Sequence, residues 1–354
     1  MVMKSALAGG LFAAVVFVAV PTADGQDGAR WYRGNTHAHT LNSDGDVTPD
    51  MVVRWYREHG YHFTFITDHE HITDVGPLNG LFARAERFLV LSGQEVSQRV
   101  ADPDHPDKVR QAHVNALGVT RVIWPDGERY TANTSIAETY ASNLEKIQSR
   151  GGLMQVNHPN FRWSVPMEEM LSLPDSTIFE LWNGHPIVYN EGGTDADGNA
   201  MPPTEVLWDS LLSRGKLLFG VGDDDSHSFW PRDAEDMDKA RPGRAWIWVR
   251  ADTLTHEAIL RSLRRGDFYA STGIQLAAYR VTADEMYVSI TPSSDRRYLT
   301  EFIGRGGEIL ASVPGMSATY VFSGDELYVR ARVTDSSGRK AWMQPIRLAR
   351  GVVE

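Results

Sequence analysis

Histidine and carboxylate side chains recur at short spacings through the first 227 residues of this chain. In chain order the groups are His37-Ala38-His39, Ser43-Asp44-Gly45, Thr67-Asp68-His69, Gly93-Gln94-Glu95, His113, His158-Pro159 and Asp225-Ser226-His227. Imidazole and carboxylate ligands without thiolate suit Zn²⁺, Mn²⁺ or Fe²⁺, and several carboxylates favour a bridged site with more than one ion. The sequence therefore predicts a divalent-metal centre.

Two of these groups place both side chains on one face of an extended segment. His37 and His39 are two residues apart, as are Asp225 and His227, so each pair can hold one cation. A single pair of this kind would more often be a surface or core feature. Groups that follow successive strands differ, because barrels and open α/β sheets gather their strand ends at one place.

Most of these groups follow apolar stretches that have the length of strands. The expected strands are Trp31–Thr36, His62–Thr67, Phe88–Ser92, Ala112–Val119, Gly152–Val156, Ile178–Trp182 and Leu217–Val221. Helical patterns lie between them, beginning at Thr48-Pro49, at Ser135 with a capping box to Glu138, and at Pro203. Strands that alternate with helices predict a parallel sheet, either doubly wound or closed as a barrel.

The pattern changes near residue 273. Thr255–Arg265 is expected to form a last helix, and Gly266–Gly273 an exit loop. The short alternating segments beyond it are Leu276–Val281, Met286–Ile290, Ala318–Phe322, Leu327–Val333 and Trp342–Leu348. The expected fold class is therefore α/β over residues 26–273, with a small all-β, sandwich-like domain over residues 274–354.

Residues 1–25 have the features of a signal peptide. Lys4 precedes an uncharged apolar run over residues 6–20, and small residues follow at Ala23-Asp24-Gly25. The run is short for a membrane span of about 20 residues, although an uncleaved anchor is the alternative. We expect an exported protein, periplasmic or secreted, with no stable membrane insertion after cleavage. The absence of cysteine excludes disulfides and a lipid-anchored cysteine.

Composition narrows the class of partner. Of 354 residues, 42% are hydrophobic and 23% charged, which is typical of a globular protein. The net charge is −11 and no block of Lys or Arg occurs, which argues against a partner bound through nucleic-acid phosphates. The expected partner is a small-molecule substrate, and the sequence leaves the oligomeric state open.

Taken together and in this order, the histidine and carboxylate motifs resemble those of the PHP (polymerase and histidinol phosphatase) superfamily of metal-dependent hydrolases. The resemblance covers roughly residues 31–230 and implies a distorted (β/α)7 barrel with two or three divalent metals at its C-terminal mouth. The segments Val329–Val333 and Ala341–Ile346, with Asp335 and Gly338, resemble the C-terminal domain of exported PHP proteins related to carbaryl hydrolase.

Carried over position by position, the resemblance implies three groups of metal ligands. The first metal would be held by His37, His39, Glu95 and Asp225. Glu95 would bridge to the second metal, whose other ligands would be His113 and His158. The third would be held by Asp44, His69 and His227, where some family members have His in place of Asp44.

Such a centre predicts hydrolysis by metal-activated water, through a hydroxide that bridges two metals. Zn²⁺ lowers the pKa of bound water to about 7, and no Gly-x-Ser-x-Gly elbow is present. Glu95 and Asp225 are expected to be catalytic through the metals. Asp68 is either a proton shuttle or an aspartate that caps a loop. Of Asp223 and Asp224, one is expected to orient a ligand and the other to be solvated.

Three residues are candidates for substrate contacts. Arg162 follows His158 by four residues and could bind an anionic group, although a solvated or paired arginine is the alternative. Trp182 and Asn183 begin the segment Trp182–His185, which follows another strand and could line the pocket, although a packed aromatic at the barrel rim is the alternative for Trp182. Arg162 or Arg232 at the pocket would favour a phosphate-containing substrate.

Three functional hypotheses follow. Phosphoester hydrolysis comes first, because it is the commonest activity of the superfamily that the chain resembles. Hydrolysis of a carbamate, ester or amide comes second, from the resemblance of the C-terminal segment, and the few cationic residues in the strand-end loops slightly favour it. A non-catalytic binding module with structural metal comes third, since structural sites are normally closed by four ligands around one ion.

Overall fold

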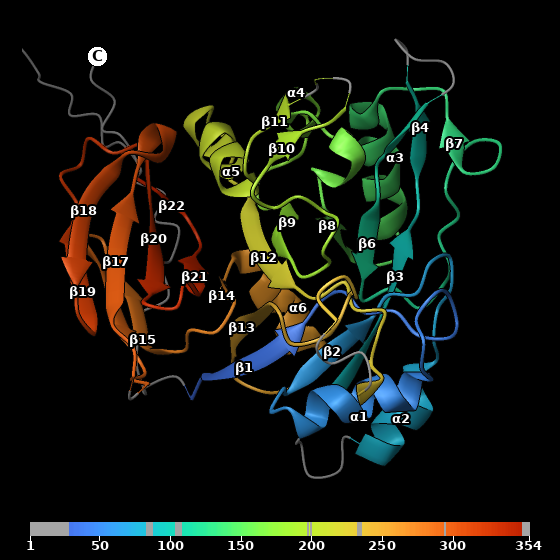
Figure 1. Cartoon of the computed structure of the whole chain (residues 1–354), viewed down its shortest axis with the longest axis horizontal. Coiled ribbons are helices and arrows are strands. Elements are labelled where there is room, and N and C mark those ends of the chain that lie inside the picture. Colours follow the sequence, from blue (N-terminus) through green and yellow to red (C-terminus); the bar gives the residue numbers. More distant parts are fainter. Residues whose placement is uncertain are drawn as a thin grey trace, which may run out of the picture.

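Two parts make up the protein, an α/β part and a mostly β part, as the computed structural model shows in Figure 1. The structure describes residues 28–82, 88–102, 108–196, 198, 200–231, 236–293 and 295–348. The expected signal peptide and Arg232 lie outside these residues. Within the described part of the chain, no helix has the length and apolar character needed to cross a membrane.

Seven neighbouring strands of the largest sheet form the centre of the α/β part. They are β1 Arg30–Asn35, β2 Phe63–Ile66, β3 Leu89–Val96, β6 Val114–Leu117, β8 Leu153–Val156, β9 Ile178–Asn183 and β12 Phe219–Asp223. Their spatial order is β12-β9-β8-β6-β3-β2-β1. Just beyond β1 and β12, Ala38 and Ser226 form a parallel bridge, and the His39 amide donates to the Ser226 carbonyl at 2.9 Å. The seven strands therefore close into a barrel.

One barrel strand runs against its neighbours. β6 pairs antiparallel with β3 and β8, so that Val114 lies opposite Val96 on one side and Val156 on the other. The other neighbouring pairs are parallel. The expected all-parallel arrangement is therefore wrong at β6. As a consequence, the start of β6, where His113 lies, meets the carboxyl ends of the other six strands at the end of the barrel that we call the mouth.

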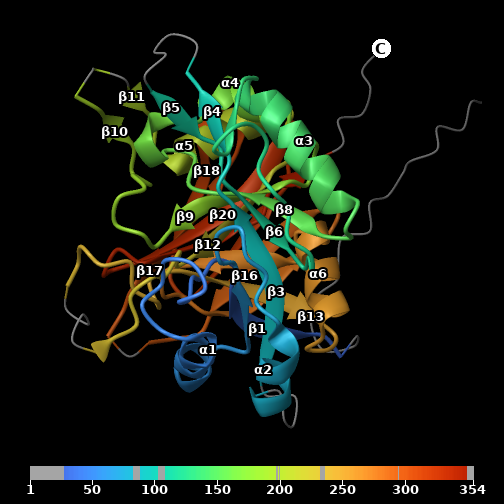
Figure 2. The same ribbon diagram turned by 90° about the vertical axis from the view of Figure 1, so that its right-hand side faces the viewer.

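Six α-helices are described, namely α1 Pro49–Glu58, α2 Val75–Phe82, α3 Ile136–Gln148, α4 Met167–Met170, α5 Thr204–Ser213 and α6 His256–Arg265. The predicted capping box of α3 is confirmed, because the Glu138 amide donates to Ser135 Oγ and the Ser135 amide donates to the Glu138 carboxylate. α3 lies on the outside of the barrel (Figure 2), where it contacts β8 and contributes Tyr140 and Ile147 to the apolar cluster that also contains Val156.

On the far side of β1 the same sheet continues into the C-terminal part. The strands in spatial order are β13 Trp246–Ala251, β14 Phe268–Ser271, β21 Lys340–Met343, β20 Tyr328–Asp335, β17 Tyr298–Ile303 and β18 Ile309–Pro314, and β22 Ile346–Arg347 also pairs with β20. The expected exit loop Gly266–Gly273 is wrong, because it contains β14. This strand pairs with both β13 and β21, so the sheet is continuous across residue 273.

A second sheet covers the first one in the C-terminal part. It consists of β15 Leu276–Val281, β16 Glu285–Ile290 and β19 Ser317–Val321. Met286 and Val288 from this sheet are buried in one apolar cluster with Phe302, Val329 and Val333 from the large sheet. Two sheets with a shared core make a sandwich. The predicted fold class, α/β with an all-β C-terminal region, is confirmed.

Short elements complete the chain. They are β4 Arg99–Ala101, β5 Val109–Gln111 and β7 Thr131–Ala132, which form a small sheet, the hairpin β10 Gly193–Thr194 and β11 Ala200–Met201, and the 3₁₀ turns η2 Phe161–Trp163 and η4 Arg305–Gly307. The polar insertion that holds the β10–β11 hairpin leaves β9 at the barrel mouth and returns to α5.

A buried ion-pair network joins α5 to the sandwich. Arg330 and Arg332 are two residues apart on β20, and Glu205 and Asp209 are four apart on α5, so each pair shares one face. Arg330 Nε and Nη2 donate to the two Asp209 oxygens at 2.7 and 2.6 Å. Arg332 Nη1 donates to Glu205 at 2.9 Å. The side chain of Arg330 is 1% exposed, so its charge depends on these partners.

We expect Asp209→Ala to lower the free energy of unfolding by about 3 kcal/mol, because it leaves the buried Arg330 guanidinium without its two-pronged partner. Urea titration followed by circular dichroism measures the change. Glu285→Ala is the matched control, since its ion pair with Arg280 is partly exposed and contributes less than about 1 kcal/mol. Equal stabilities of the two variants would show that the network does not hold α5 to the sandwich.

Candidate metal centre

All nine predicted metal ligands lie together at the barrel mouth. They are His37, His39 and Asp44 after β1, His69 after β2, Glu95 in β3, His113 before β6, His158 after β8, and Asp225 and His227 after β12. Their ligand atoms fall into three adjoining groups, each close enough to surround one ion.

The first group is buried and has the dimensions of a single coordination sphere. His37 Nε2 lies 3.0 Å from Glu95 Oε2 and 3.3 Å from Asp225 Oδ1. His39 Nε2 lies 3.2 and 3.3 Å from the same two oxygens, and 3.0 Å from His37 Nε2. A tetrahedral ion with bonds of about 2.0–2.1 Å holds its ligand atoms about 3.3 Å apart. The four side chains therefore fit one ion.

The second group uses the other oxygen of Glu95. Glu95 Oε1 lies 3.0 Å from His113 Nδ1 and 3.3 Å from His158 Nε2. The Gln111 side-chain oxygen lies 3.0 Å from His113 Nε2 and can only accept, so it places the proton on Nε2 and leaves the Nδ1 lone pair for an ion. One carboxylate thus faces two ligand groups, which is the geometry of a bridging ligand.

The third group is the most open. Asp44 Oδ1 lies 3.4 Å from His227 Nε2, and Asp44 Oδ2 lies 3.5 Å from His69 Nε2. The side chain of Asp44 is 55% exposed, whereas those of Glu95 and Asp225 are 2% and 7% exposed. His39 Nδ1 also lies 3.4 Å from Asp44 Oδ1, so His39 stands between the first and third groups.

We expect Asp44→Ala to weaken binding only at the third group, by at least about tenfold, because the ligand atoms of the first two groups do not include Asp44. Metal content per chain, measured by inductively coupled plasma mass spectrometry after dialysis, should fall by one ion. Loss of all metal would show that this partition into three groups is wrong.

The carboxylate of Glu180, which was not predicted to take part, forms hydrogen bonds that hold the metal ligands in place. Glu180 on β9 is 1% exposed, and its Oε1 accepts from His37 Nδ1 at 2.6 Å. Its Oε2 accepts from the His158 amide at 2.6 Å and from Asn183 Nδ2 at 2.7 Å. Because the carboxylate fixes the His37 proton on Nδ1, the Nε2 lone pair points into the first group. An acidic residue within the apolar run Ile178–Trp182 was the signal, since a buried charge needs partners.

Asp223 and Asp224 are both fully buried, so the expectation that one is solvated is wrong. Asp224 accepts from the Arg244 and Ala245 amides at 2.7 and 3.0 Å and from the Tyr56 hydroxyl at 2.9 Å. Asp223 Oδ2 accepts from Thr36 and Gln155. Burial raises the pKa of Asp223 well above its ordinary value, and the nearby Glu180 charge raises it further. Through these hydrogen bonds, both aspartates fix the ends of the strands that carry the metal ligands.

Asp68, a candidate proton shuttle, is engaged on every side. It is fully buried and accepts from the Thr40 amide at 2.7 Å, the Thr40 hydroxyl at 2.9 Å, Ser43 Oγ at 2.9 Å and Thr73 Oγ1 at 3.0 Å. It is not among the residues that line the cavity at the mouth. The geometry favours the loop-capping alternative, in which Asp68 shapes the loop that carries Asp44.

The three candidate substrate contacts lie outside this cavity. Asn183 Nδ2 donates to Asp225 Oδ2 at 3.1 Å as well as to Glu180, so it holds a metal ligand in place. Trp182 lines a different cavity, where its ring stacks on Trp342 with centroids 5.6 Å apart. Arg162 is exposed, with its guanidinium carbon 5.2 Å from the Phe161 ring.

A β-bulge explains why Trp182 and Asn183 point in these directions. Val221 and Gly222 of β12 pair with Glu180 and Trp182 of β9, so Leu181 is an extra residue on β9. Strict alternation would place Glu180 and Trp182 on one face. The bulge instead puts Asn183 beside Glu180, and leaves Leu181 and Trp182 together on the outer side.

The cavity at the mouth measures about 200 Å³. Besides seven of the nine ligands, it is lined by Phe161, His185, Ile187 and Val188, of which only His185 belongs to a segment that was expected to line the pocket. Neither Arg nor Lys occurs among the described lining residues. Burial lowers the pKa of His185 to about 4, so this side chain is neutral at physiological pH. The wall that faces the ligands is therefore uncharged.

Three of the nine described non-glycine residues with positive φ angles lie at or beside the metal ligands. Asp225, His158 and Glu70 have positive φ angles of 46°, 24° and 44°. Non-glycine residues in such conformations cost about 1–3 kcal/mol each and persist where the surroundings fix them. Two of the three are predicted metal ligands, so the fold holds these ligands at the expense of local stability.

The carboxylates of the centre set the charge state of the metal-free protein. Burial alone would lower the pKa of His69, but the charges of Glu95 and Asp44 raise it to about 9. Neighbouring carboxylates also raise the pKa of His37, His158 and His227 against the effect of burial. His69 is therefore protonated near neutral pH without metal, so metal binding at this side chain must release a proton.

The raised pKa of His69 predicts the direction in which the stability of the metal-free protein changes with pH. The pKa of His69 is higher in the folded protein than its ordinary 6.5, so its stabilising contribution is complete below pH 6.5 and is lost as pH rises through about 9. We expect the melting temperature of the metal-free protein to fall by on the order of 5 °C across this window, while metal affinity rises. Differential scanning calorimetry of the metal-free protein measures the melting temperature, and isothermal titration of that protein with metal measures the affinity. A melting temperature that rises through pH 9 would contradict the assignment.

Comparisons with known proteins concern the fold. No protein-family model matches the chain, and no curated protein matches it. A solved two-domain protein from Bacteroides vulgatus, described as containing a predicted PHP-like metal-dependent phosphoesterase, is similar over 92% of this chain and 95% of its own, at 16% identity and a TM-score of 0.47. An amidohydrolase from Chromobacterium violaceum is similar over 55% of this chain and 87% of its own, at 15% identity and a TM-score of 0.32. Likenesses at this level do not identify a reaction.

Proposed function

We propose that this protein is a metal-dependent hydrolase and that phosphoesters are its first candidate substrates. The observation that carries the proposal is the Glu95 carboxylate, whose two oxygens face two separate ligand groups. When bound there, divalent ions would activate water and polarise a substrate oxygen. A structural site would instead be closed by four ligands around one ion, so the adjoining groups and the open cavity disfavour a non-catalytic module.

Residues around the metal ligands hold these ligands in place and form an apolar wall beside them. His37 and Asp225 are held by the buried Glu180 and Asn183, so their ligand atoms are aligned before any ion or substrate arrives. Phe161, Ile187 and Val188 form an apolar wall beside them. A cavity of about 200 Å³ admits the reacting group of a small molecule and excludes a folded macromolecule.

A second candidate is hydrolysis of a carbamate, ester or amide. Two observations favour it, namely the uncharged wall of Phe161, His185, Ile187 and Val188, and the lack of Arg or Lys among the described lining residues. A phosphate monoester would rely on bound ions alone for charge compensation. A neutral ester or carbamate carries no charge of its own, so it needs no cationic side chain in the pocket.

We also propose that the protein acts after export, in the periplasm or outside the cell, as a relative of the exported branch that includes carbaryl hydrolase. The apolar run over residues 6–20 and the segment Ala341–Ile346 support this placement. Detection of the mature protein in a periplasmic fraction, cleaved near residue 25, would test it, and a full-length protein in the cytoplasm would contradict it.

The deciding experiment is a hydrolysis panel on protein reconstituted separately with Zn²⁺, Mn²⁺ and Fe²⁺. It compares 4-nitrophenyl phosphate and bis(4-nitrophenyl) phosphate with 1-naphthyl N-methylcarbamate and 4-nitrophenyl acetate. His158→Ala should abolish turnover, whereas His256→Ala, on an exposed residue outside the three groups, should retain it. Preference for the carbamate or acetate would favour the second candidate, and no turnover by metal-loaded protein would overturn the hydrolase proposal.

A further inference from the structure

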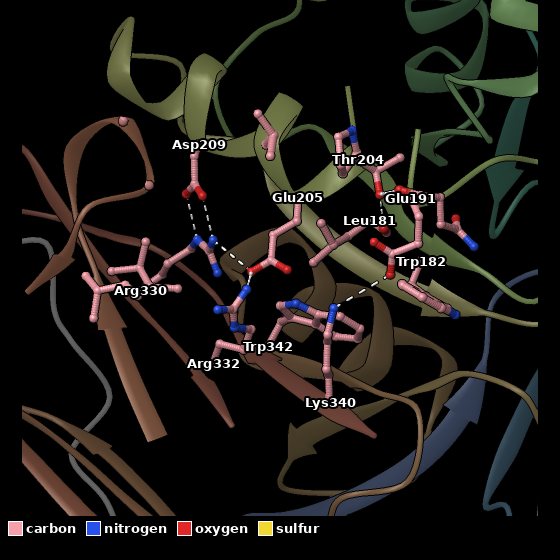
Figure 3. A pocket seen from close by; sticks show the side chains of 17 residues that line it. Leu181, Trp182, Glu191, Thr204, Glu205, Asp209, Arg330, Arg332, Lys340 and Trp342 are labelled. Carbon is pink, nitrogen blue, oxygen red and sulfur yellow. Dashed lines mark hydrogen bonds and ion pairs between the residues drawn. The ribbon is translucent and has the colours of Figure 1, made fainter. Parts of the chain in front are cut away.

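A second cavity, about 330 Å³, lies where the sandwich meets the barrel (Figure 3). One wall comes from β9 and α5 with the loop before it, and the other from β20, β21 and the η4–β18 segment. It shares no lining residue with the cavity at the barrel mouth. Its size is within the range of small-molecule sites, which is about 300–1,000 Å³.

The charged side chains of this cavity are already paired with one another. Figure 3 shows Arg330 joined to Asp209 and Glu205, and Arg332 joined to Glu205. At the open side, Lys340 Nζ lies 3.7 Å from Glu191. The lining therefore holds three cations and three anions, and an ionic ligand would have to break existing pairs. A neutral ligand that can both donate and accept hydrogen bonds meets no such cost.

The cavity also has an aromatic floor. The rings of Trp182 and Trp342 stack with centroids 5.6 Å apart and planes 27° apart. Trp342 is 1% exposed, so Trp182 supplies the accessible indole surface. The Lys340 ammonium lies over the Trp182 ring, 5.7 Å from its centroid. An indole face attracts the positively polarised C–H groups of a saturated ring, as it attracts a cation.

We propose that this cavity is a binding site for a neutral saccharide of one or two pyranose units. The sugar ring packs on Trp182, and its hydroxyls donate to Glu191 and Glu205 and accept from Lys340 and Arg332. Hydroxyl groups suit this lining because each can serve a carboxylate and a cation in turn without disturbing their pairing. The site needs neither metal nor hydrolysis, so it is independent of the proposed activity.

Isothermal titration calorimetry on the whole protein tests the proposal, with chelator present so that the metal centre cannot contribute. The probes are glucose, galactose, N-acetylglucosamine, maltose and cellobiose, with glycine and inorganic phosphate as ionic alternatives. We expect at least one saccharide to bind with a Kd on the order of 1 mM, undisturbed by glycine or phosphate. No heat from any saccharide at roughly 20 mM, or displacement by glycine or phosphate, would overturn the proposal.

Three variants test whether the saccharide binds in this cavity. Trp182→Ala should weaken saccharide binding at least about tenfold through loss of the ring surface. Ile309→Trp fills the cavity from a residue that is 52% exposed, so it should block binding even if Trp182→Ala fails to fold. Trp124→Ala, at an exposed tryptophan that does not line the cavity, should leave the affinity unchanged. Saccharide binding that survives Ile309→Trp would contradict the assignment.

Discussion

Replacing Glu95 with Gln is expected to lower the hydrolysis rate by roughly 10³-fold, which corresponds to about 4 kcal/mol of transition-state stabilisation. The reason is that Glu95 belongs to two ligand groups, through Oε2 to His37 and His39 and through Oε1 to His113 and His158. An amide has one oxygen and one nitrogen, so one of the two groups must face an N–H that cannot bind an ion. Bound metal should fall with activity.

The control for this variant is Glu145→Gln, which makes the same chemical change on the exposed side of α3. It should retain both rate and metal content. Circular dichroism shows whether Glu95→Gln still folds, and its rate should not recover when metal is raised to excess. Full activity with a full complement of metal in Glu95→Gln would exclude a bridging role for this carboxylate.

Much of the metal centre could be predicted because residues close together in the sequence identify its ligands. His37 and His39, and Asp225 and His227, are each two residues apart beside an apolar run, and such spacing needs no knowledge of the rest of the chain. The fold then brings them together, because parallel strands end at the same edge. His113 is the exception, since it precedes its strand and reaches the mouth only because β6 is antiparallel.

What could not be predicted depends on contacts between distant residues. The pairing of Glu180 with His37 joins residues 143 positions apart, so the acidic residue in an apolar run indicates a buried charge but does not identify its partner. The direction of Trp182 depends on a bulge at Leu181, and a single extra residue reverses which side chains face the barrel interior. Pocket-lining residues such as Ile187 lie in an irregular loop, where no periodicity applies.

The C-terminal strands were predicted unevenly for a related reason. β16 alternates between buried and half-buried positions, so a two-residue period identified it, whereas β15 is buried only near its two ends and shows no such alternation in the structure. β14 is fully buried and only four residues long, which resembles a short apolar loop more than a strand. Its strand character comes from β13 and β21 on either side, and these lie far away in the sequence.

β9 connects the two cavities, because the bulge gives it two functional faces. Its inner face carries Glu180 and Asn183 to the metal ligands, and its outer face carries Leu181 and Trp182 to the cavity beside the sandwich. Trp182, two residues after Glu180 on the same strand, stacks on Trp342 of the sandwich.

Glu180→Gln is accordingly expected to lower metal affinity by about 10–100-fold and the hydrolysis rate with it, although Glu180 is not itself among the nine predicted ligands. The Glu180 oxygens accept from His37 Nδ1 and from the His158 amide, and both of these groups are donors. An amide nitrogen at either place would put two donors face to face. His37 would then move its proton to Nε2, where it would occupy the lone pair that points into the first ligand group.

Asp223→Asn is the matched control in the same buried network. Asp223 Oδ2 accepts from Thr36 and Gln155, and Oδ1 has no partner among the described residues, so an asparagine keeps the one oxygen that is used. We expect its metal affinity to change less than about threefold. Titration of both variants with Zn²⁺ against a chelating indicator separates the cases. Equal losses in the two variants would mean that the network acts through packing alone, whereas a loss confined to Glu180→Gln would show that the proton position on His37 controls the metal centre.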